Sequence, residues 1–298
     1  MASKNLLDFI SESYRIIKAH RRHFYTLSSI FLFPFSFSLI LYPTLSNHFQ
    51  QHHTSLFFTL LYSLFLSLFS YSGVISITYS VFHFFYDQPV NLLSAINSIS
   101  TSFLPLLATT IVSQLIFFFI SLFYGLLLLL LTHGAAFLHV TIPYSLPLYL
   151  IAFFVALPLL LVMTYLQVKW TLVPVIVVVE SCWGLEPLRR STRLIKGMKG
   201  VALSSMIFYG FFTWAMVFMC LFYVTKDSDG DNWFSVVFNW VYVVCQSWAT
   251  ASVIMPSNLA VNTVLYIYCK ANHGEIVEEF GKDYVSLPFH DGNVSHAV

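Results

Sequence analysis

The chain has 298 residues, of which 58% are hydrophobic and only 9% are charged, and its net charge at pH 7 is +1. Soluble domains carry about 25% charged residues, so the composition excludes an ordinary soluble globular protein and predicts an all-α integral membrane protein. The four cysteines form no Cys-x-x-Cys pair, and Cys220 and Cys245 fall inside apolar runs, which argues against a disulfide framework.

Residues 1–22 are predicted to form a basic amphipathic helix on the cytosolic side of the membrane. Leu6, Ile10, Tyr14 and Ile17 recur at helical spacing. The basic residues beside them are Arg15, Lys18, Arg21 and Arg22. Such a helix lies flat among the lipid headgroups, with its apolar side toward the acyl chains.

Six apolar segments follow, and each is long enough for the ~20 residues that a helical crossing requires. They run from about Phe24 to Leu45, Leu56 to Tyr86, Leu106 to Leu131, Leu148 to Val173, Val201 to Val224 and Phe234 to Tyr268. The fourth apolar run continues past Pro174 to Val179, and the weakly amphipathic Asp87–Pro105 precedes the third. The sixth is too long for one straight crossing, so we expect a kink at Pro256.

An internal repeat relates the beginning of the chain to its middle. Residues 7–18 align with residues 185–196, since both begin with Leu and an acid and end with Arg, two aliphatic residues and Lys. Residues 89–100 hold the equivalent place between the second and third spans. We therefore predict one polytopic domain over residues 1–270, built from three units of a surface helix and two spans. A short polar cytosolic tail, residues 271–298, follows.

The distribution of positive charge predicts the orientation. With six spans and both termini in the cytosol, every one of the 14 lysines and arginines except Lys226 lies on the cytosolic side. Cytosolic loops are enriched in Lys and Arg, so this asymmetry favours cytosolic N- and C-termini.

Residues 169–200 join an apolar run to the densest basic cluster of the chain. Glu186 and Pro187 suit the first turn of a short helix, and Gly197 and Gly200 suit its end. Its apolar residues are Leu185, Leu188, Ile195 and Met198. The candidates for binding lipid headgroups are Arg189, Arg190, Arg193, Lys196 and Lys199. Alternatively, these charges only set the topology.

The same stretch carries a family resemblance. The residues concerned are Trp170, Pro174, Glu180, Gly184, Leu185, Leu188, Arg190, Ser191, Leu194, Lys196 and Gly197. This pattern resembles a family of uncharacterised plant polytopic transmembrane proteins and, more distantly, the membrane domain attached to some bacterial glycerophosphodiester phosphodiesterases. The resemblance implies no catalysis, because the hydrolytic site of those phosphodiesterases lies in a separate soluble domain that this sequence does not contain.

Glu180 is the acidic residue nearest the membrane interior. An acid at that depth is costly unless it is paired. We expect a structural ion pair with Lys169, Arg190 or Arg193, and the alternative is a lipid-headgroup or ion site.

Three polar residues fall inside the last apolar segment: Gln246, Asn258 and Asn262. The two asparagines are one helical turn apart, just beyond Pro256. Amides in this setting form hydrogen bonds between helices, which we favour, or a transport site in a proline-broken helix. No Asp or Glu lies deep in any predicted span, which argues against coupled transport.

Little in the chain points to catalysis, a cofactor or a metal. His48, His52 and His53 resemble one histidine box of membrane di-iron enzymes, but such sites need several boxes on one side of the membrane. We therefore expect no metal, no cofactor, no nucleic acid and no enzymatic activity. The expected partners are membrane lipids, including anionic ones, and other membrane proteins.

The sequence predicts a structural or lipid-interacting multi-pass protein of the endoplasmic reticulum or plasma membrane. The alternative function is a small-solute or lipid transporter that uses the last span, kinked at Pro256. An enzyme of lipid metabolism is the least favoured class. A hydrophilic cavity reaching Gln246, Asn258 and Asn262 would favour transport, whereas a packed centre would favour the structural role.

Overall fold

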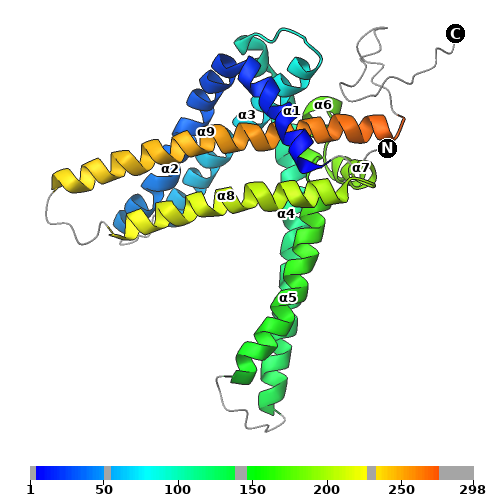
Figure 1. Ribbon diagram of the computed structural model, residues 1–298. Coiled ribbons are helices and arrows are strands. Elements are labelled where there is room, and N and C mark those ends of the chain that lie inside the picture. The colour runs from blue at the N-terminus through cyan, green and yellow to red at the C-terminus, as the bar shows by residue number, and fades with distance from the viewer. Residues whose placement is uncertain (1–4, 50–54, 138–145, 227–232, 275–298) are drawn as a thin grey trace.

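Helices make up all the regular secondary structure of residues 5–49, 55–137, 146–226 and 233–274, the part of the chain that this computed structural model describes (Figure 1). In chain order they are α1 Leu6–Ala19, α2 Arg21–Phe49, α3 Ser55–Phe85, α4 Leu92–Phe137, α5 Leu146–Lys169, α6 Val173–Glu180, α7 Leu185–Leu194, α8 Lys199–Lys226 and α9 Trp233–Asn272. The all-α class is therefore confirmed. The tail beyond residue 274 lies outside the described residues.

Five segments of the described chain are long and apolar enough to cross a membrane. They are Thr59–Phe85, Leu92–Leu131, Phe153–Glu180, Lys199–Met219 and Val241–Asn272. The first predicted span falls on α2, whose side chains beyond Ser38 lie outside the described residues. A count of six spans thus stays a prediction.

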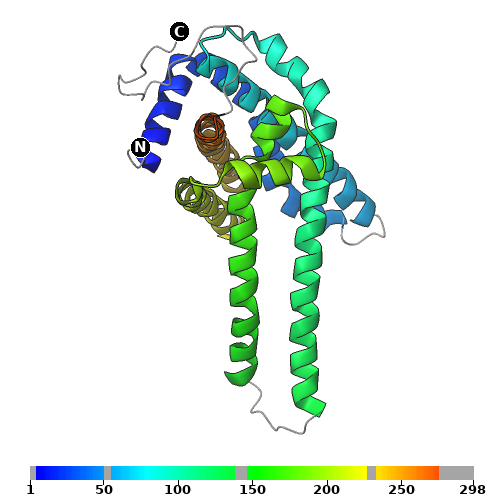
Figure 2. The ribbon, with the colours of Figure 1, turned by 90° about the vertical axis from the view of Figure 1, so that its right-hand side faces the viewer.

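The long helices are arranged as three hairpins. α2 packs along α3, α4 along α5, and α8 along α9, and the hairpins extend from a common region in different directions (Figure 1). Figure 2 shows the α4–α5 hairpin as a long projection from the rest of the molecule. These pairs correspond to the predicted two-span units.

The region where the hairpins meet contains the core, and we call it the hub: α1, residues 24–31 of α2, residues 77–84 of α3, residues 172–195 with α6 and α7, and residues 259–269 of α9. Leu172, Ile176, Leu194, Ile195 and Leu265 are all within one hydrophobic cluster there and are almost completely buried. The hub therefore consists of short helices and helix ends, rather than of the middles of the long helices.

Helix α1 forms as predicted, but its most buried side is rotated from the predicted apolar side, of which Ile10 and Ile17 are still half-buried against the core. Phe9 and Ile16 face the core with Glu12 and Ser13, whereas Tyr14 is 61% exposed. The Phe9 ring packs edge-on against Tyr268 of α9, at 5.4 Å between ring centroids. The buried Glu12 carboxylate accepts a 2.6 Å hydrogen bond from Arg15, which offsets the cost of removing it from water. Helix α1 is thus docked onto α9.

The chain departs from the predicted fourth span after Lys169. It turns at residues 170–172 and begins α6 at Val173, so the apolar run to Val179 is not one straight helix. Pro174 occupies the second position of α6, where a missing N–H costs no helical hydrogen bond. Five of the eight residues of α6 are buried by protein. An apolar run looks the same in a sequence whether lipid or protein covers it.

Two other prolines do not interrupt their helices. Residues 92–105, expected ahead of the third span, form the beginning of α4, which continues through Pro105 to Phe137. The middle unit therefore has no separate surface helix among the described residues. Helix α9 likewise continues from Trp233 through Pro256 to Asn272.

Candidate functional site: helix α7 and its attachments

A tight turn positions α7 directly after α6. Ser181 adopts a left-handed conformation with φ 53°, and Gly184 adopts φ 76° and ψ −126°. Residues with a side chain rarely reach the Gly184 conformation, so glycine is required there. The Gly184 N–H donates a 3.0 Å hydrogen bond to the Thr109 hydroxyl, which fixes the turn to α4.

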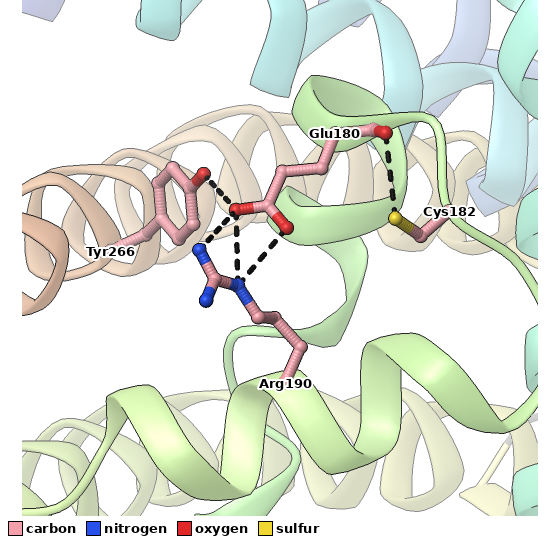
Figure 3. A network of polar contacts seen from close by, with 4 residues as sticks. All are labelled: Glu180, Cys182, Arg190 and Tyr266. Carbon is pink, nitrogen blue, oxygen red and sulfur yellow. Dashed lines mark hydrogen bonds and ion pairs between the residues drawn. The ribbon is translucent and has the colours of Figure 1, made fainter. Parts of the chain in front are cut away.

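Glu180 lies at the centre of a polar contact between three helices (Figure 3). Arg190 of α7 approaches the carboxylate with Nε 3.2 Å from Oε2 and a terminal guanidinium nitrogen 3.3 Å from Oε1. The Tyr266 hydroxyl of α9 donates a 2.7 Å hydrogen bond to Oε1. The Arg190 and Glu180 side chains are only 20% and 18% exposed. Partial burial makes this charge-assisted contact stronger than one at the surface.

The structure thus selects one of the three basic residues that the sequence offered as partners. The Lys169 ammonium lies over the Tyr165 ring, 4.2 Å from its centroid, and Arg193 is exposed. Tyr266 was missed by sequence reasoning, because it lies 86 residues from Glu180 and no local pattern marks it.

A buried hydroxyl attaches α7 to the end of α5. The Ser191 side chain donates a 2.6 Å hydrogen bond to the carbonyl of Lys169, and Ser191 is completely buried. Leu188 and Leu194 are also buried on this side of α7. Gly197, with φ 99°, follows the end of α7, whereas Gly200 lies inside α8 and does not end the helix.

The opposite side of α7 and the start of α8 carry exposed charge. Four of the five headgroup candidates are exposed: Arg189, Arg193, Lys196 and Lys199. We call these four residues the basic face. Arg190 does not belong to it, since its guanidinium is held by Glu180. Next to the basic face, Trp183 is 69% exposed and Leu185 is 50% exposed.

The turn also contains a thiol. Cys182 donates a weak 3.5 Å hydrogen bond to the Glu180 carbonyl. Burial raises the pKa of the Cys182 thiol, and the carboxylates of Glu186 and Glu180 raise it further. A raised pKa leaves little thiolate at neutral pH, so Cys182 is a poor nucleophile.

The polar residues of α9 lie in two places. Asn258 and Asn262 line a groove of about 480 Å³, mainly between α8 and α9, whereas Gln246 is exposed elsewhere on α9. The Asn262 amide N–H donates a 3.3 Å hydrogen bond to Asn258 Oδ1. This contact between the two amides is within one helix, whereas the sequence favoured hydrogen bonds between helices.

Within the described ranges, no group of three or more His, Cys, Asp or Glu side chains could hold a metal ion. Of the three histidines that resemble a histidine box, His52 and His53 lie outside these ranges, and His48 falls in α2.

Comparison with known proteins gives one match. The family described as a domain of unknown function, DUF8558, matches residues 42–283. No curated protein and no solved structure matches the chain. The matched range includes α3 to α9 and hence the whole α6–α7 site. Because the match extends over most of its length, the chain belongs to the DUF8558 family.

Proposed function

We propose that this protein is a non-enzymatic, multi-pass membrane protein that binds anionic lipid headgroups through the basic face. One observation carries the proposal: Glu180 pairs with Arg190 and leaves the four cations of the basic face exposed. Each basic residue near an anionic leaflet contributes roughly 1 kcal/mol to membrane attraction. The proposed role is structural, namely holding a helical framework against a charged membrane surface.

The residues beside the basic face support a position at the membrane interface. Trp183 and Leu185 are large apolar side chains left exposed on the turn and the first residue of α7. Tryptophan is enriched where hydrocarbon meets headgroups, because its ring is apolar and its N–H is polar. An exposed apolar pair adjoining exposed cations is the arrangement expected of an interfacial helix.

The orientation that fits this proposal has both termini in the cytosol, in the endoplasmic reticulum or the plasma membrane. Anionic lipids are concentrated in the cytosolic leaflet, so the basic face belongs on that side. The sequence Asn293-Val294-Ser295 provides a test, although it lies outside the described residues. It should stay unglycosylated in native membranes, and a glycosidase-sensitive mass shift at Asn293 would reverse the orientation.

The headgroup proposal is tested with the full chain in nanodiscs of defined lipid. Neutralising Arg189, Arg193 and Lys196 by substitution with Gln should remove most of the enrichment of anionic over neutral lipid that co-purifies with the protein. The matched control changes the same three residues but keeps their charge: Arg189→Lys, Arg193→Lys and Lys196→Arg. Equal enrichment in the wild type and the Gln variant would contradict the proposal.

A lipid or small-solute transporter is the second candidate, favoured by the groove that Asn258 and Asn262 line. Transport predicts movement of labelled lipid or solute across liposomes that contain the protein. The resemblance to plant transmembrane proteins and to the phosphodiesterase membrane domain remains an expectation beside both proposals.

A further inference from the structure

The groove between α8 and α9 is lined by residues of both helices. On α8 it is lined by a helical stripe of Met206, Gly210, Thr213 and Val217, with Ser205, Tyr209 and Trp214 beside it. Asn258 and Asn262 of α9 and Thr171 complete the lining. The stripe covers three helical turns, so the groove is elongated along the helices. A volume of about 480 Å³ is within the usual range for a small-ligand site.

The lining changes character along the groove. The end nearest the hub has Thr171, Ser205 and Asn262, and the far end has Trp214 and Val217. The Asn262 Oδ1 atom is buried and has no hydrogen-bond partner among the described residues. That atom has almost no accessible surface, so the polar surface that an occupant meets at this end comes from the other hydroxyl and amide atoms of the lining. The occupant therefore combines a hydrogen-bonding end with an apolar chain.

Two lysines are close along the chain to the hub end of the groove. Lys169 precedes the lining residue Thr171 by two residues, and Lys199 precedes Met206 by seven and therefore shares its helical face. The Lys169 ammonium lies 4.2 Å from the centroid of the Tyr165 ring. Neither lysine has a carboxylate within 4.0 Å in the described part of the chain. An anionic group at this end would meet two cations without competing with an internal carboxylate.

The surroundings decide what kind of molecule fits. Both walls belong to segments that are long and apolar enough to cross a membrane, Lys199–Met219 and Val241–Asn272. Outside such segments lies lipid rather than water. A lipid has its charged headgroup and its acyl chain in the same order as the lysines and the apolar lining.

We infer that the groove holds one acyl chain of an anionic phospholipid, with the phosphate at Lys169 and Lys199. This inference rests on the proposed lipid-binding function and specifies a second, intramembrane contact with one lipid molecule. This contact shares Lys199 with the basic face, whereas the other three cations of that face meet lipids that exchange at the surface.

The test uses the full chain in nanodiscs that contain phosphatidylglycerol with a photoreactive group in one acyl chain. After illumination, labelled peptides should map to residues 205–217 and 258–262. Gly210→Leu should lower this labelling about tenfold, the effect of losing contact with roughly two methylene groups. A side chain at Gly210 meets nothing within 4 Å, so it projects into the groove without a clash. Gly125→Leu on α4 has equally open space and is the matched control that should label like the wild type.

Two further measurements separate the parts of the inference. Unlabelled phosphatidylglycerol in excess should compete away the label on the wild-type protein, which needs no variant, and label that persists would overturn the site. Phosphatidylcholine with the same photoreactive chain should label the groove weakly in the wild type. In Lys169→Gln/Lys199→Gln, the two lipids should label equally.

Each contrary result has a definite meaning. Equal labelling in the wild type and a normally folded Gly210→Leu variant would overturn the groove as a site. Loss of the labelling when two copies of the chain share one nanodisc would place a second copy over the groove and also overturn it. If the groove labels as expected while neutralising Arg189, Arg193 and Lys196 changes nothing, the headgroup proposal fails and the groove stands.

Discussion

The hub and the α4–α5 hairpin are made of the same kinds of residue, yet they bury them differently. In α6, Ile176 is completely buried by protein, whereas in α4, Leu126 is 59% exposed. None of the most apolar window of Leu92–Leu131 is buried, compared with 61% of the corresponding window of Val241–Asn272. Hydrophobicity therefore marks which side chains avoid water, and the helix contacts decide whether protein or lipid covers them.

This difference has an energetic consequence. A side chain packed by protein loses its contacts when it is shortened and leaves a cavity, because the surrounding helices do not fully collapse. A side chain facing lipid is covered again by mobile acyl chains. The stability of this protein should thus depend on the hub, although the hairpin is the more apolar region.

The comparison is tested most directly by shortening two aliphatic side chains, one packed by protein in the hub and one exposed on α4. Ile176→Ala should lower the free energy of unfolding by about 2–5 kcal/mol, because it creates a cavity in the hub. Leu126→Ala should lower it by less than about 0.5 kcal/mol, as is usual for positions without packing partners. Thermal unfolding in mild detergent measures both. Equal losses would mean that the exposed face of α4 is covered by protein in the native assembly.

The polar part of the hub is tested at Glu180. Glu180→Gln leaves the partly buried Arg190 without its counter-charge and should cost about 2 kcal/mol of stability. Glu186→Gln, on the exposed first turn of α7, is the control and should change stability by less than about 0.5 kcal/mol. The reverse order in a thermal-unfolding experiment would show that the Glu180–Arg190–Tyr266 contact does not hold the hub together.

A smaller effect is expected where polar groups face the groove. Asn258 and Asn262 bond to each other within α9, so replacing both with Leu should change the free energy of unfolding by less than about 1 kcal/mol. The same variant should reduce groove labelling, because the hydrogen-bonding end is lost. A large loss of stability would instead indicate that these amides connect helices.

The smallest predicted effect concerns Cys182. Its pKa is raised, so its alkylation should be slow at pH 8 and should accelerate as the pH rises. Removing one raising charge with Glu186→Gln should speed the reaction at pH 8, since more thiolate is present. Peptide mapping after timed alkylation measures the rate, and Asp87→Asn is a remote control. An unchanged rate in Glu186→Gln would place the two side chains farther apart than described.

Local patterns predicted most of the helices but few of their contacts. Helical spacing and the Glu186-Pro187 start located α7, and the cost of an isolated acid indicated that Glu180 needs a basic partner. The choice of Arg190, the participation of Tyr266 and the turn at residues 170–172 depend on three helices meeting in space. The periodic pattern of apolar residues predicts each helix by itself and carries no information about which helices contact one another.

The groove between α8 and α9 could not be predicted from the sequence either. Asn258 and Asn262 were recognised as unusual, but their neighbours Ser205 and Tyr209 come from another helix and look like ordinary span residues. The buried face of α1 was also misplaced, because Glu12 and Ser13 appear polar in the sequence and are buried only through local hydrogen bonds. Hydrogen bonds that compensate for burying polar side chains can be identified only from the positions of those side chains in the structure.

Helix α7 and the turn before it make hydrogen bonds or ion pairs with three long-range partners. The turn before α7 is tied to α4 at Thr109, its middle to the end of α5 at the Lys169 carbonyl, and its arginine to α9 through Glu180 and Tyr266. This helix of ten residues thus connects the α4–α5 hairpin to the α8–α9 hairpin, and the two hairpins otherwise extend apart. Displacing α7 would therefore disturb contacts to the α4–α5 hairpin and to α9 at the same time.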